Sequence, residues 1–248
     1  MTVRGLPLPF SLIALDRVGS TNDEARRLVP EGRAADFLVV TAREQTSGRG
    51  RRGRAWVSPP GNLHCSVLLE IGALAEAAQL GFVAAVALVD ALGGLVPGAE
   101  FRCKWPNDVL ADGRKIAGML LEPAGSGWLV LGLGIDVAAA PPPEQVAFPA
   151  ISLAELGGLC NAEAVLAAFC ADFGPWVRCW RERGFAPVRQ AWLDRCRGLG
   201  KPISVRLETH TAEGLFAGLD ADGALLLDQA AEGVTRFMAG DVFFPASR

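Results

Sequence analysis

The sequence lacks the residues that several classes of site require. It has two histidines, and none of its six cysteines forms a Cys-x-x-Cys pair. Zinc, haem and iron–sulfur sites are therefore not expected, and free thiols in a reducing cytoplasm are the simpler interpretation. The longest uncharged apolar stretch, residues 77–89, is shorter than the ~20 residues of a membrane span. Acidic residues outnumber basic ones by 27 to 24, giving a net charge of −3, which argues against a broadly basic nucleic-acid-binding protein.

The length and composition indicate an ordinary globular protein. At ~150 residues per domain, the 248 residues suggest one large domain, or one large and one small domain. Half of the residues are hydrophobic and 21% are charged, which is close to the average for folded domains. Residues 6–15 are apolar, but no cleavage pattern follows them. We therefore expect a strand there rather than a secretion signal.

The hydrophobic periodicity predicts a mixed α/β region followed by a small β region. Helices are expected from Thr21, over 76–92, from Asn161 to near Gly184, and over 188–196. Strands are expected over 37–41, 64–71, 100–105, 115–122 and 128–137, with a hairpin at Asp112-Gly113. After Gly198 the period changes to two. Residues 199–248 are therefore predicted to form a small all-β domain, and residues 1–198 the main domain.

A segment rich in glycine and arginine, Gly48–Arg54 (GRGRRGR), lies between two predicted strands. Its glycines let the backbone approach a ligand closely, and its arginines offer forked donors that match phosphate or carboxylate. Trp56 follows closely and could stack on a base. A solvated basic loop or a nucleic-acid patch would have the same composition. The negative net charge of the chain and the position between two strands favour a local anion site.

Lys104 stands at the end of a predicted buried strand, in the segment KWPND at 104–108. An unpaired buried charge is costly, so a lysine at this point is uncommon. Its ammonium group either faces a ligand at the strand end or extends to solvent. The residue alone does not decide between these two arrangements.

Three glycines, Gly118, Gly132 and Gly134, lie inside predicted strands. Glycine weakens a strand and usually marks a bulge or the close approach of a ligand or another segment. Close packing against a helix is the simpler explanation. The segment Ser20-Thr21-Asn22 has an equally simple explanation as the start of a helix.

Taken in order, these segments resemble the bacterial biotin–protein ligases. They are STN at 20–22, Gln45 before GRGRRGR, KWPND, KIAG at 115–118 and GLGID at 132–136. The resemblance extends from about Leu15 to the C-terminus, and GRGRRGR together with KWPND is its most specific part. It implies an α/β (α+β) fold. A catalytic domain with a mixed sheet like that of class II tRNA synthetases is followed by a small C-terminal SH3-like β-barrel.

The resemblance also implies an activity. Members of this family use ATP to activate biotin as biotinoyl-5′-AMP, then transfer the biotinoyl group to a specific lysine of the biotin carboxyl carrier protein. Mg²⁺ arrives with ATP, so neither a protein metal ligand nor a bound transition metal is expected. The first step brings a carboxylate onto a phosphate. Two such charges about 4 Å apart repel by ~4 kcal/mol at an effective dielectric constant of about 20, so cations are needed there.

The same resemblance implies a role for each site residue. Lys104 and Arg51 are expected to be catalytic. The residues expected to bind biotin are Ser20, Thr21, Asn22, Gln45, Arg49, Gly50, Arg51, Lys104, Gly118, Gly132 and Gly134. The residues expected to bind ATP or the adenylate are Arg49, Arg51, Arg54, Trp56, Asn107, Lys115 and Asp136.

The sequence departs from the family pattern at Asp136, where the glycine-containing strand usually ends in asparagine. An aspartate there could repel phosphate, could act as an oxygen ligand of Mg²⁺, or could be a tolerated substitution. Some relatives also carry an N-terminal helix-turn-helix domain, whereas 19 residues precede Ser20 here. We therefore expect a cytoplasmic, monofunctional ligase that binds neither DNA nor membranes, with homodimer formation possible.

Three other functions compete with this interpretation. Lipoate–protein ligases share the fold but lack GRGRRGR and KWPND. A non-catalytic biotin- or adenylate-binding protein is argued against by the intact Lys104 and the complete arginine segment. An RNA-binding role would depend on the arginine segment alone and would show salt-dependent affinity.

Overall fold

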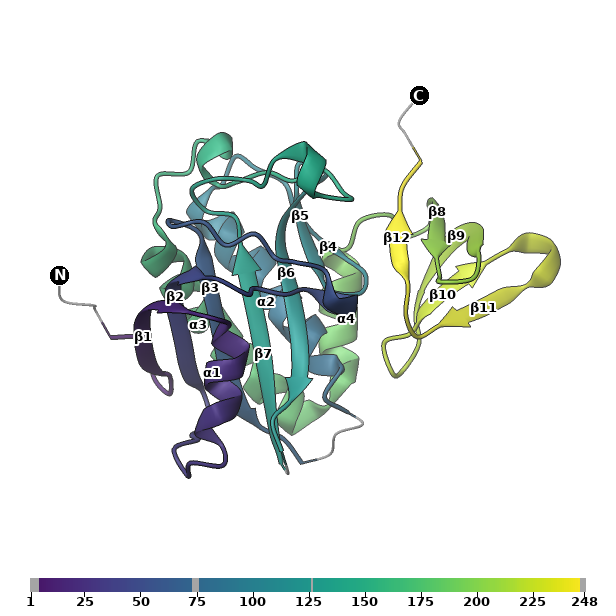
Figure 1. The fold of residues 1–248 in the computed structure, drawn as a ribbon. Coiled ribbons are helices and arrows are strands. Elements are labelled where there is room, and N and C mark those ends of the chain that lie inside the picture. Colours follow the sequence, from purple (N-terminus) through teal and green to yellow (C-terminus); the bar gives the residue numbers. More distant parts are fainter. Residues whose placement is uncertain (1–4, 73–75, 126, 246–248) are drawn as a thin grey trace.

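The computed structural model describes residues 5–72, 76–125 and 127–245 (Figure 1). Its main element is a sheet of seven strands in the order β1-β2-β3-β7-β6-β5-β4. The strands are β1 (Ser11–Val18), β2 (Leu38–Gln45), β3 (Leu63–Glu70), β4 (Phe101–Lys104), β5 (Asp108–Ala111), β6 (Arg114–Pro123) and β7 (Trp128–Ile135). β1 pairs with β2 in parallel, and the remaining pairs are antiparallel. The predicted mixed sheet is confirmed.

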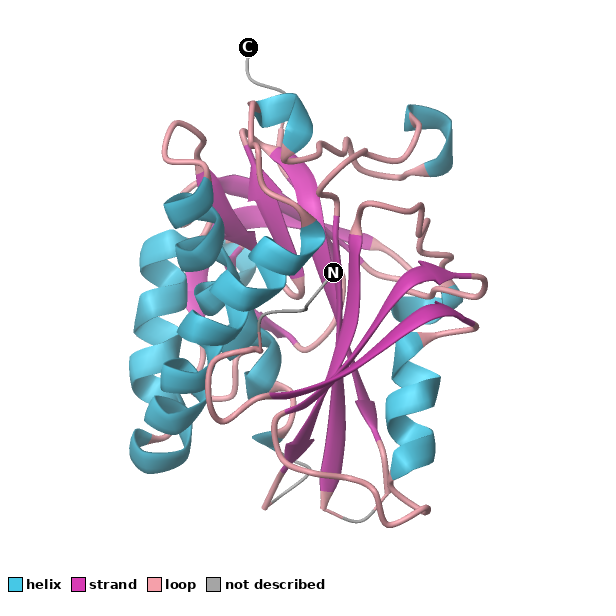
Figure 2. Ribbon diagram, turned by 90° about the vertical axis from the view of Figure 1, so that its left-hand side faces the viewer, coloured by secondary structure: helices cyan, strands magenta, loops and turns pink. Residues whose placement is uncertain are grey.

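Helices cover both faces of this sheet. They are α1 (Thr21–Leu28), α2 (Gln79–Leu95), α3 (Ala162–Arg183) and α4 (Phe185–Arg195). α2, α3 and α4 lie on one face and α1 on the other (Figure 2). α2 is apolar on nearly all sides and is buried between the sheet and the other two helices, as expected for a helix without a polar face. α1 buries Ala25 and Leu28 in a second, smaller apolar cluster.

Local sequence explains several boundaries. The Asn161 side chain accepts a hydrogen bond from the backbone N–H of Ala164 (2.9 Å) and caps α3. Asp112 and Gly113 both have positive φ, 47° and 78°, in the predicted hairpin between β5 and β6. The prediction for α2 was off by three residues at each end, because the helix continues through Gly93 and Gly94. Leu92 and Leu95 on either side of them pack into the core, which outweighs the low helix propensity of glycine.

The C-terminal region forms a separate antiparallel sheet in the order β11-β10-β9-β8-β12. Its strands are β8 (Pro202–Arg206), β9 (Thr211–Leu219), β10 (Leu225–Asp228), β11 (Val234–Phe237) and β12 (Asp241–Phe243). The short β12 was not foreseen from the sequence. This sheet lies beside α4 and β4 (Figure 1). Trp192 of α4 packs edge-on against Phe216 of β9.

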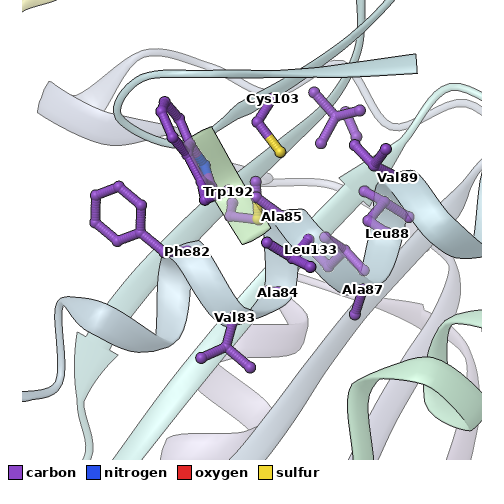
Figure 3. Packing of buried hydrophobic residues seen from close by; sticks show 14 of the residues in the cluster. Phe82, Val83, Ala84, Ala85, Ala87, Leu88, Val89, Cys103, Leu133 and Trp192 are labelled. Carbon is purple, nitrogen blue, oxygen red and sulfur yellow. The ribbon is translucent and has the colours of Figure 1, made fainter. Parts of the chain in front are cut away.

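The apolar core is continuous between the two sheets. Phe82, near the start of α2, packs against Trp192 of α4 (Figure 3). Both belong to one apolar cluster with Cys103 and with inward residues of the C-terminal sheet. The indole N–H of Trp105 donates to the carbonyl of Gly223 (3.1 Å). The described cysteines are unpaired, as predicted. Among the described helices, none has the length and apolar character of a membrane span.

Candidate active site

A cavity of about 390 Å³ opens beside the sheet where α1, the arginine segment, β6, β7 and the loop at 141–150 meet. Every residue that the sequence predicted for the site lines this cavity. Several cavity residues were not predicted, among them Asp108, Phe148, Asp241 and Phe243. The last two come from the C-terminal sheet, so no local motif could have pointed to them.

One end of the cavity is a neutral network of hydroxyl and amide groups. Gln45 accepts hydrogen bonds from the backbone N–H (2.8 Å) and the hydroxyl (3.0 Å) of Thr21. Ser66 of β3 donates to Asn22 Oδ1 (2.5 Å) and lies 2.8 Å from Thr21 Oγ1. Ser20 precedes α1, but its hydroxyl makes no capping bond. This end therefore offers both donors and acceptors without net charge.

The strand glycines make room for two side chains of the site. A Cβ on Gly132 would overlap the Asn22 amide, and one on Gly134 would overlap the Trp56 indole. For Gly132 the simpler explanation holds, because Asn22 belongs to α1. Trp56 lies over the cavity floor, which is formed by Gly118 and Gly134. Its buried indole N–H has no hydrogen-bond partner among the described residues. Trp56 thus sits against Gly118 and Gly134, two of the glycines predicted to bind biotin, and its predicted role in binding the adenylate stays a prediction.

Two lysines converge on one buried carboxylate beside the glycine floor. Lys104 Nζ lies 3.0 Å from Asp108 Oδ2, and Lys115 Nζ lies 2.6 Å from Asp108 Oδ1. The Lys104 side chain is 6% exposed and its ammonium group lies 4.3 Å from the centre of the Phe148 ring. The alternative in which Lys104 extends to solvent is therefore wrong. Burial would raise the pKa of Asp108, but Lys115 and Lys104 outweigh it and lower this pKa to about 2.

The arginines of the segment differ in what they contact. Within the described part of the chain, no carboxylate lies within ion-pair distance of Arg51, which donates to Asn107 Oδ1 (3.1 Å). Burial lowers the pKa of Arg51, although an arginine stays protonated. Arg49, by contrast, is paired with Asp23 (2.6 Å) and Glu122 (3.0 Å). Arg51 is the member of the segment that is available to an anion.

A chain of polar contacts joins the neutral end of the cavity to the arginine segment. Asn22 donates through Nδ2 to Glu122 (2.6 Å), and Glu122 accepts from Arg49. Both polar atoms of the Asn22 side chain are therefore engaged by the protein. On the other side of the segment, Arg54 pairs with Asp241 of β12 (3.1 Å). The segment is held at both ends, at one by Asp23 and Glu122, and at the other by the C-terminal sheet.

Asp136 lies at the end of β7, is 2% exposed and lines the cavity. Its Oδ1 accepts a hydrogen bond from Asn62 Nδ2 (3.1 Å). Burial raises the pKa of Asp136 to about 7, against the attraction of Lys115 and with the help of Glu155. Among the described residues, no group of three His, Cys, Asp or Glu side chains is arranged to hold a metal ion.

This arrangement suits one type of chemistry. A neutral, donor-and-acceptor pocket leads into a region where Arg51, Lys104 and Lys115 meet. Fixed cations in a partly buried cavity stabilise charge that develops between two anionic groups. The geometry thus fits the joining of an uncharged, polar head group bearing a carboxylate to a phosphate.

Comparisons with known proteins agree in sequence and in structure. Residues 14–135 match the biotin/lipoate A/B protein ligase family, and residues 198–244 match the biotin protein ligase C-terminal domain. A biotin--[acetyl-CoA-carboxylase] ligase of Paracoccus denitrificans is 45% identical, covering 93% of this chain and 99% of the relative. One of Mycobacterium tuberculosis is 33% identical, covering 91% and 86%. The solved biotin protein ligase of Aquifex aeolicus, in complex with biotin and ATP, superposes with a TM-score of 0.81 at 28% identity, covering 94% and 97%.

Proposed function

Because this chain belongs to the biotin–protein ligase family, we propose that it biotinylates a carrier protein at the expense of ATP in two steps. In the first, a carboxylate oxygen of biotin attacks the α-phosphorus of ATP, and pyrophosphate leaves. In the second, the amine of a carrier lysine attacks the acyl carbon of biotinoyl-5′-AMP. An amide bond forms, AMP leaves and the amine loses a proton.

The neutral end of the cavity would hold the biotin head group. Its ureido ring carries both N–H donors and a carbonyl acceptor, which match the hydroxyl and amide groups of Ser20, Thr21 and Gln45 that line the cavity. Trp56 lies over Gly118 and Gly134 and would form an apolar wall for the ring and chain. A lipoyl dithiolane offers no such hydrogen bonds, so this polar network favours biotin over lipoate.

The cationic region would hold the reacting groups. Lys104, Lys115 and Arg51 would neutralise the biotin carboxylate and the α-phosphate as they approach, with Lys104 and Arg51 as the catalytic residues. Asn107, fixed by its bond to the carbonyl of Met119 (2.6 Å), would hold Arg51 in place. Mg²⁺ would enter on the phosphates of ATP, where it supplies further positive charge. The observation that supports this assignment best is the convergence of both lysines on Asp108 beside the neutral pocket.

The acceptor we propose is the biotin carrier of acetyl-CoA carboxylase, in keeping with the names of the two sequence relatives. We also propose a catalytic domain over 1–198 and an SH3-like domain over 199–248, with Asp241 and Phe243 completing the site. A cytoplasmic location, homodimer formation and the lack of DNA or membrane binding stay predictions.

The test is the exchange of labelled pyrophosphate into ATP with biotin or lipoate as the only acid. Exchange with biotin and not lipoate is expected, followed by a biotinoyl mass increase on a purified carrier domain. Lys104→Ala should abolish the exchange. The exposed Lys201 provides the matched control, and Lys201→Ala should retain it. Exchange with lipoate alone would overturn the substrate, and tight biotin binding without exchange would indicate a non-catalytic binding protein.

A further inference from the structure

Among the buried carboxyl groups of the described residues, Asp136 is the one that the proposed chemistry leaves unexplained. It is held by Asn62, whose orientation is fixed by the backbone. Asn62 Oδ1 accepts from the N–H groups of Val137 (3.0 Å), Ala138 (2.9 Å) and Ala139 (3.1 Å), and Nδ2 also donates to the Ala139 carbonyl (2.8 Å). Asn62 can therefore offer Asp136 one hydrogen and cannot turn to offer more.

The second oxygen of Asp136 has no hydrogen-bond or ion-pair partner within the described ranges, and the residue lines the cavity. A buried carboxylate normally has a cation or several donors around it. Asp108, the first residue of β5, lines the same cavity and has two lysines. Asp136 has a single amide. These surroundings suit a neutral carboxylic acid. Its carbonyl oxygen accepts the hydrogen bond from Asn62, and its O–H has one hydrogen to donate to a ligand.

The charged groups around Asp136 do not change this conclusion. Lys115 on β6 attracts the carboxylate, but its ammonium group is bonded to Asp108 at 2.6 Å. Glu155 of the short helix η4 (Ala154–Leu156) repels it. His64 on β3 is buried, and burial lowers its pKa, so it adds no positive charge near neutral pH. Burial, with a smaller contribution from Glu155, raises the pKa of Asp136 to about 7 against the attraction of Lys115.

We propose that Asp136 receives the adenylate in its protonated form, donating a hydrogen bond to the ligand, so that binding is coupled to the uptake of one proton. This inference rests on the proposed function, because it concerns the nucleotide side of the same cavity. An ionised Asp136 would instead present a negative oxygen to a ligand that already carries a phosphate charge. Asp136 is thus a positioning residue whose protonation state selects the binding-competent form of the site.

Because protonation of Asp136 and binding of the adenylate are linked, the apparent Kd should depend on pH. Above neutral pH the protonated fraction of Asp136 falls, so the apparent Kd for the adenylate should rise by about tenfold per pH unit. In Asp136→Asn the side chain is isosteric and neutral at every pH. Its N–H can replace the carboxylic O–H as donor, so its affinity should not depend on pH.

The experiment is isothermal titration calorimetry of the full chain with biotinol-5′-AMP, the stable analogue in which a methylene group replaces the acyl carbonyl. The phosphodiester of this analogue does not titrate between about pH 6 and about pH 9, whereas the terminal phosphate of ATP does. This pH range extends roughly one to two units on either side of neutrality. Kd is measured across the range. Proton uptake is obtained at pH 8 from two buffers of different ionisation enthalpy. The wild type should take up about one proton and lose affinity above pH 7, and Asp136→Asn should do neither.

Two further variants complete the design. Asp16→Asn removes an exposed carboxylate outside the cavity and should behave as the wild type. Asp136→Ser removes the titrating group in a different shape and keeps the test usable if the asparagine variant does not fold. Its affinity should also be independent of pH.

Parallel pH profiles in the wild type and Asp136→Asn, without proton uptake, would overturn the inference. So would unchanged binding of the analogue together with loss of Mg·ATP binding in Asp136→Asn, which would make Asp136 a ligand of the metal on ATP. Failure of the proposed function has a different signature: no biotin-dependent pyrophosphate exchange by the wild type at any pH.

Discussion

Two groups of cations face the same cavity and are held in opposite ways. Lys104 and Lys115 project from the sheet, and both are bonded to one buried carboxylate. The arginine segment lies over the cavity, and its ion pairs are partly exposed. The side chains of Arg54 and Asp241 are 49% and 25% exposed. Buried pairs cannot exchange for water or ligand without a large cost, whereas exposed pairs exchange readily.

This difference indicates separate tasks for the two groups. The lysine pair is a preorganised charge that needs no rearrangement when the reacting anions arrive. The arginine segment contacts Asp23, Glu122 and Asp241 in the absence of ligand, and a phosphate could replace any of these carboxylates. The segment can thus close over a ligand by exchanging one set of surface pairs for another.

The largest expected effect comes from breaking the buried group. Asp108→Ala leaves two ammonium groups without a counter-charge, which should lower the free energy of unfolding by about 3–5 kcal/mol. Urea denaturation measures this loss, and pyrophosphate exchange should disappear with it. The triple variant with Lys104→Met and Lys115→Met should recover most of the stability but none of the exchange. Near-wild-type stability of Asp108→Ala alone would show that the pair is not a buried, compensated unit.

A comparable loss of rate, without loss of stability, is expected at Arg51. Arg51→Gln should reduce biotin-dependent exchange by about 10²–10³-fold, the range for removing one preorganised donor to a developing charge. Its unfolding free energy should change by less than about 0.5 kcal/mol, because no ion pair is lost. Arg52→Gln is the matched control, because Arg52 is adjacent but does not line the cavity. Equal effects of the two substitutions would contradict the distinction between them.

Acid should weaken the buried group at a pH that Asp108 determines. The pKa of Asp108 is about 2 in the folded protein and 3.8 is its ordinary value. The folded state therefore binds fewer protons than the unfolded state, and the stabilisation is present above pH 4. About 2 kcal/mol should be lost as the pH falls from about 4 through 2. Urea midpoints of the wild type and the triple variant, compared between about pH 5 and about pH 1.5, measure the difference, because this range brackets the two pKa values.

The smallest effect is expected from the ion pairs between the arginine segment and Asp241 of the C-terminal sheet. Asp241→Asn should lower the free energy of unfolding by less than about 1 kcal/mol, because the pairs with Arg54 and Arg52 are partly exposed to solvent. Added salt should remove even this difference. Differential scanning calorimetry at low and high ionic strength measures it. A loss as large as that of Asp108→Ala would place the two regions in the same energetic class.

Much of the site could be predicted because its residues lie in compact motifs. Each predicted residue, from Ser20 to Asp136, lines the one cavity. The partners that orient them could not be predicted. Glu122 and Ser66 have no motif of their own, and Asp241 lies more than one hundred residues from the cations that it contacts. Pairings of this kind depend on strand order, which hydrophobic periodicity does not specify.

By itself, the sequence determined the mixed α/β region, the small β region and the set of residues that gather at the cavity. Periodicity, turn residues such as Asp112-Gly113 and the motif order are properties of the chain, so they can be read along it. The tertiary structure alone decided which charges are compensated. Lys104, Lys115 and Asp108 form one buried unit, Arg51 is left without a carboxylate and Asp136 is left with a single amide, because burial and counter-charge are properties of the packed fold.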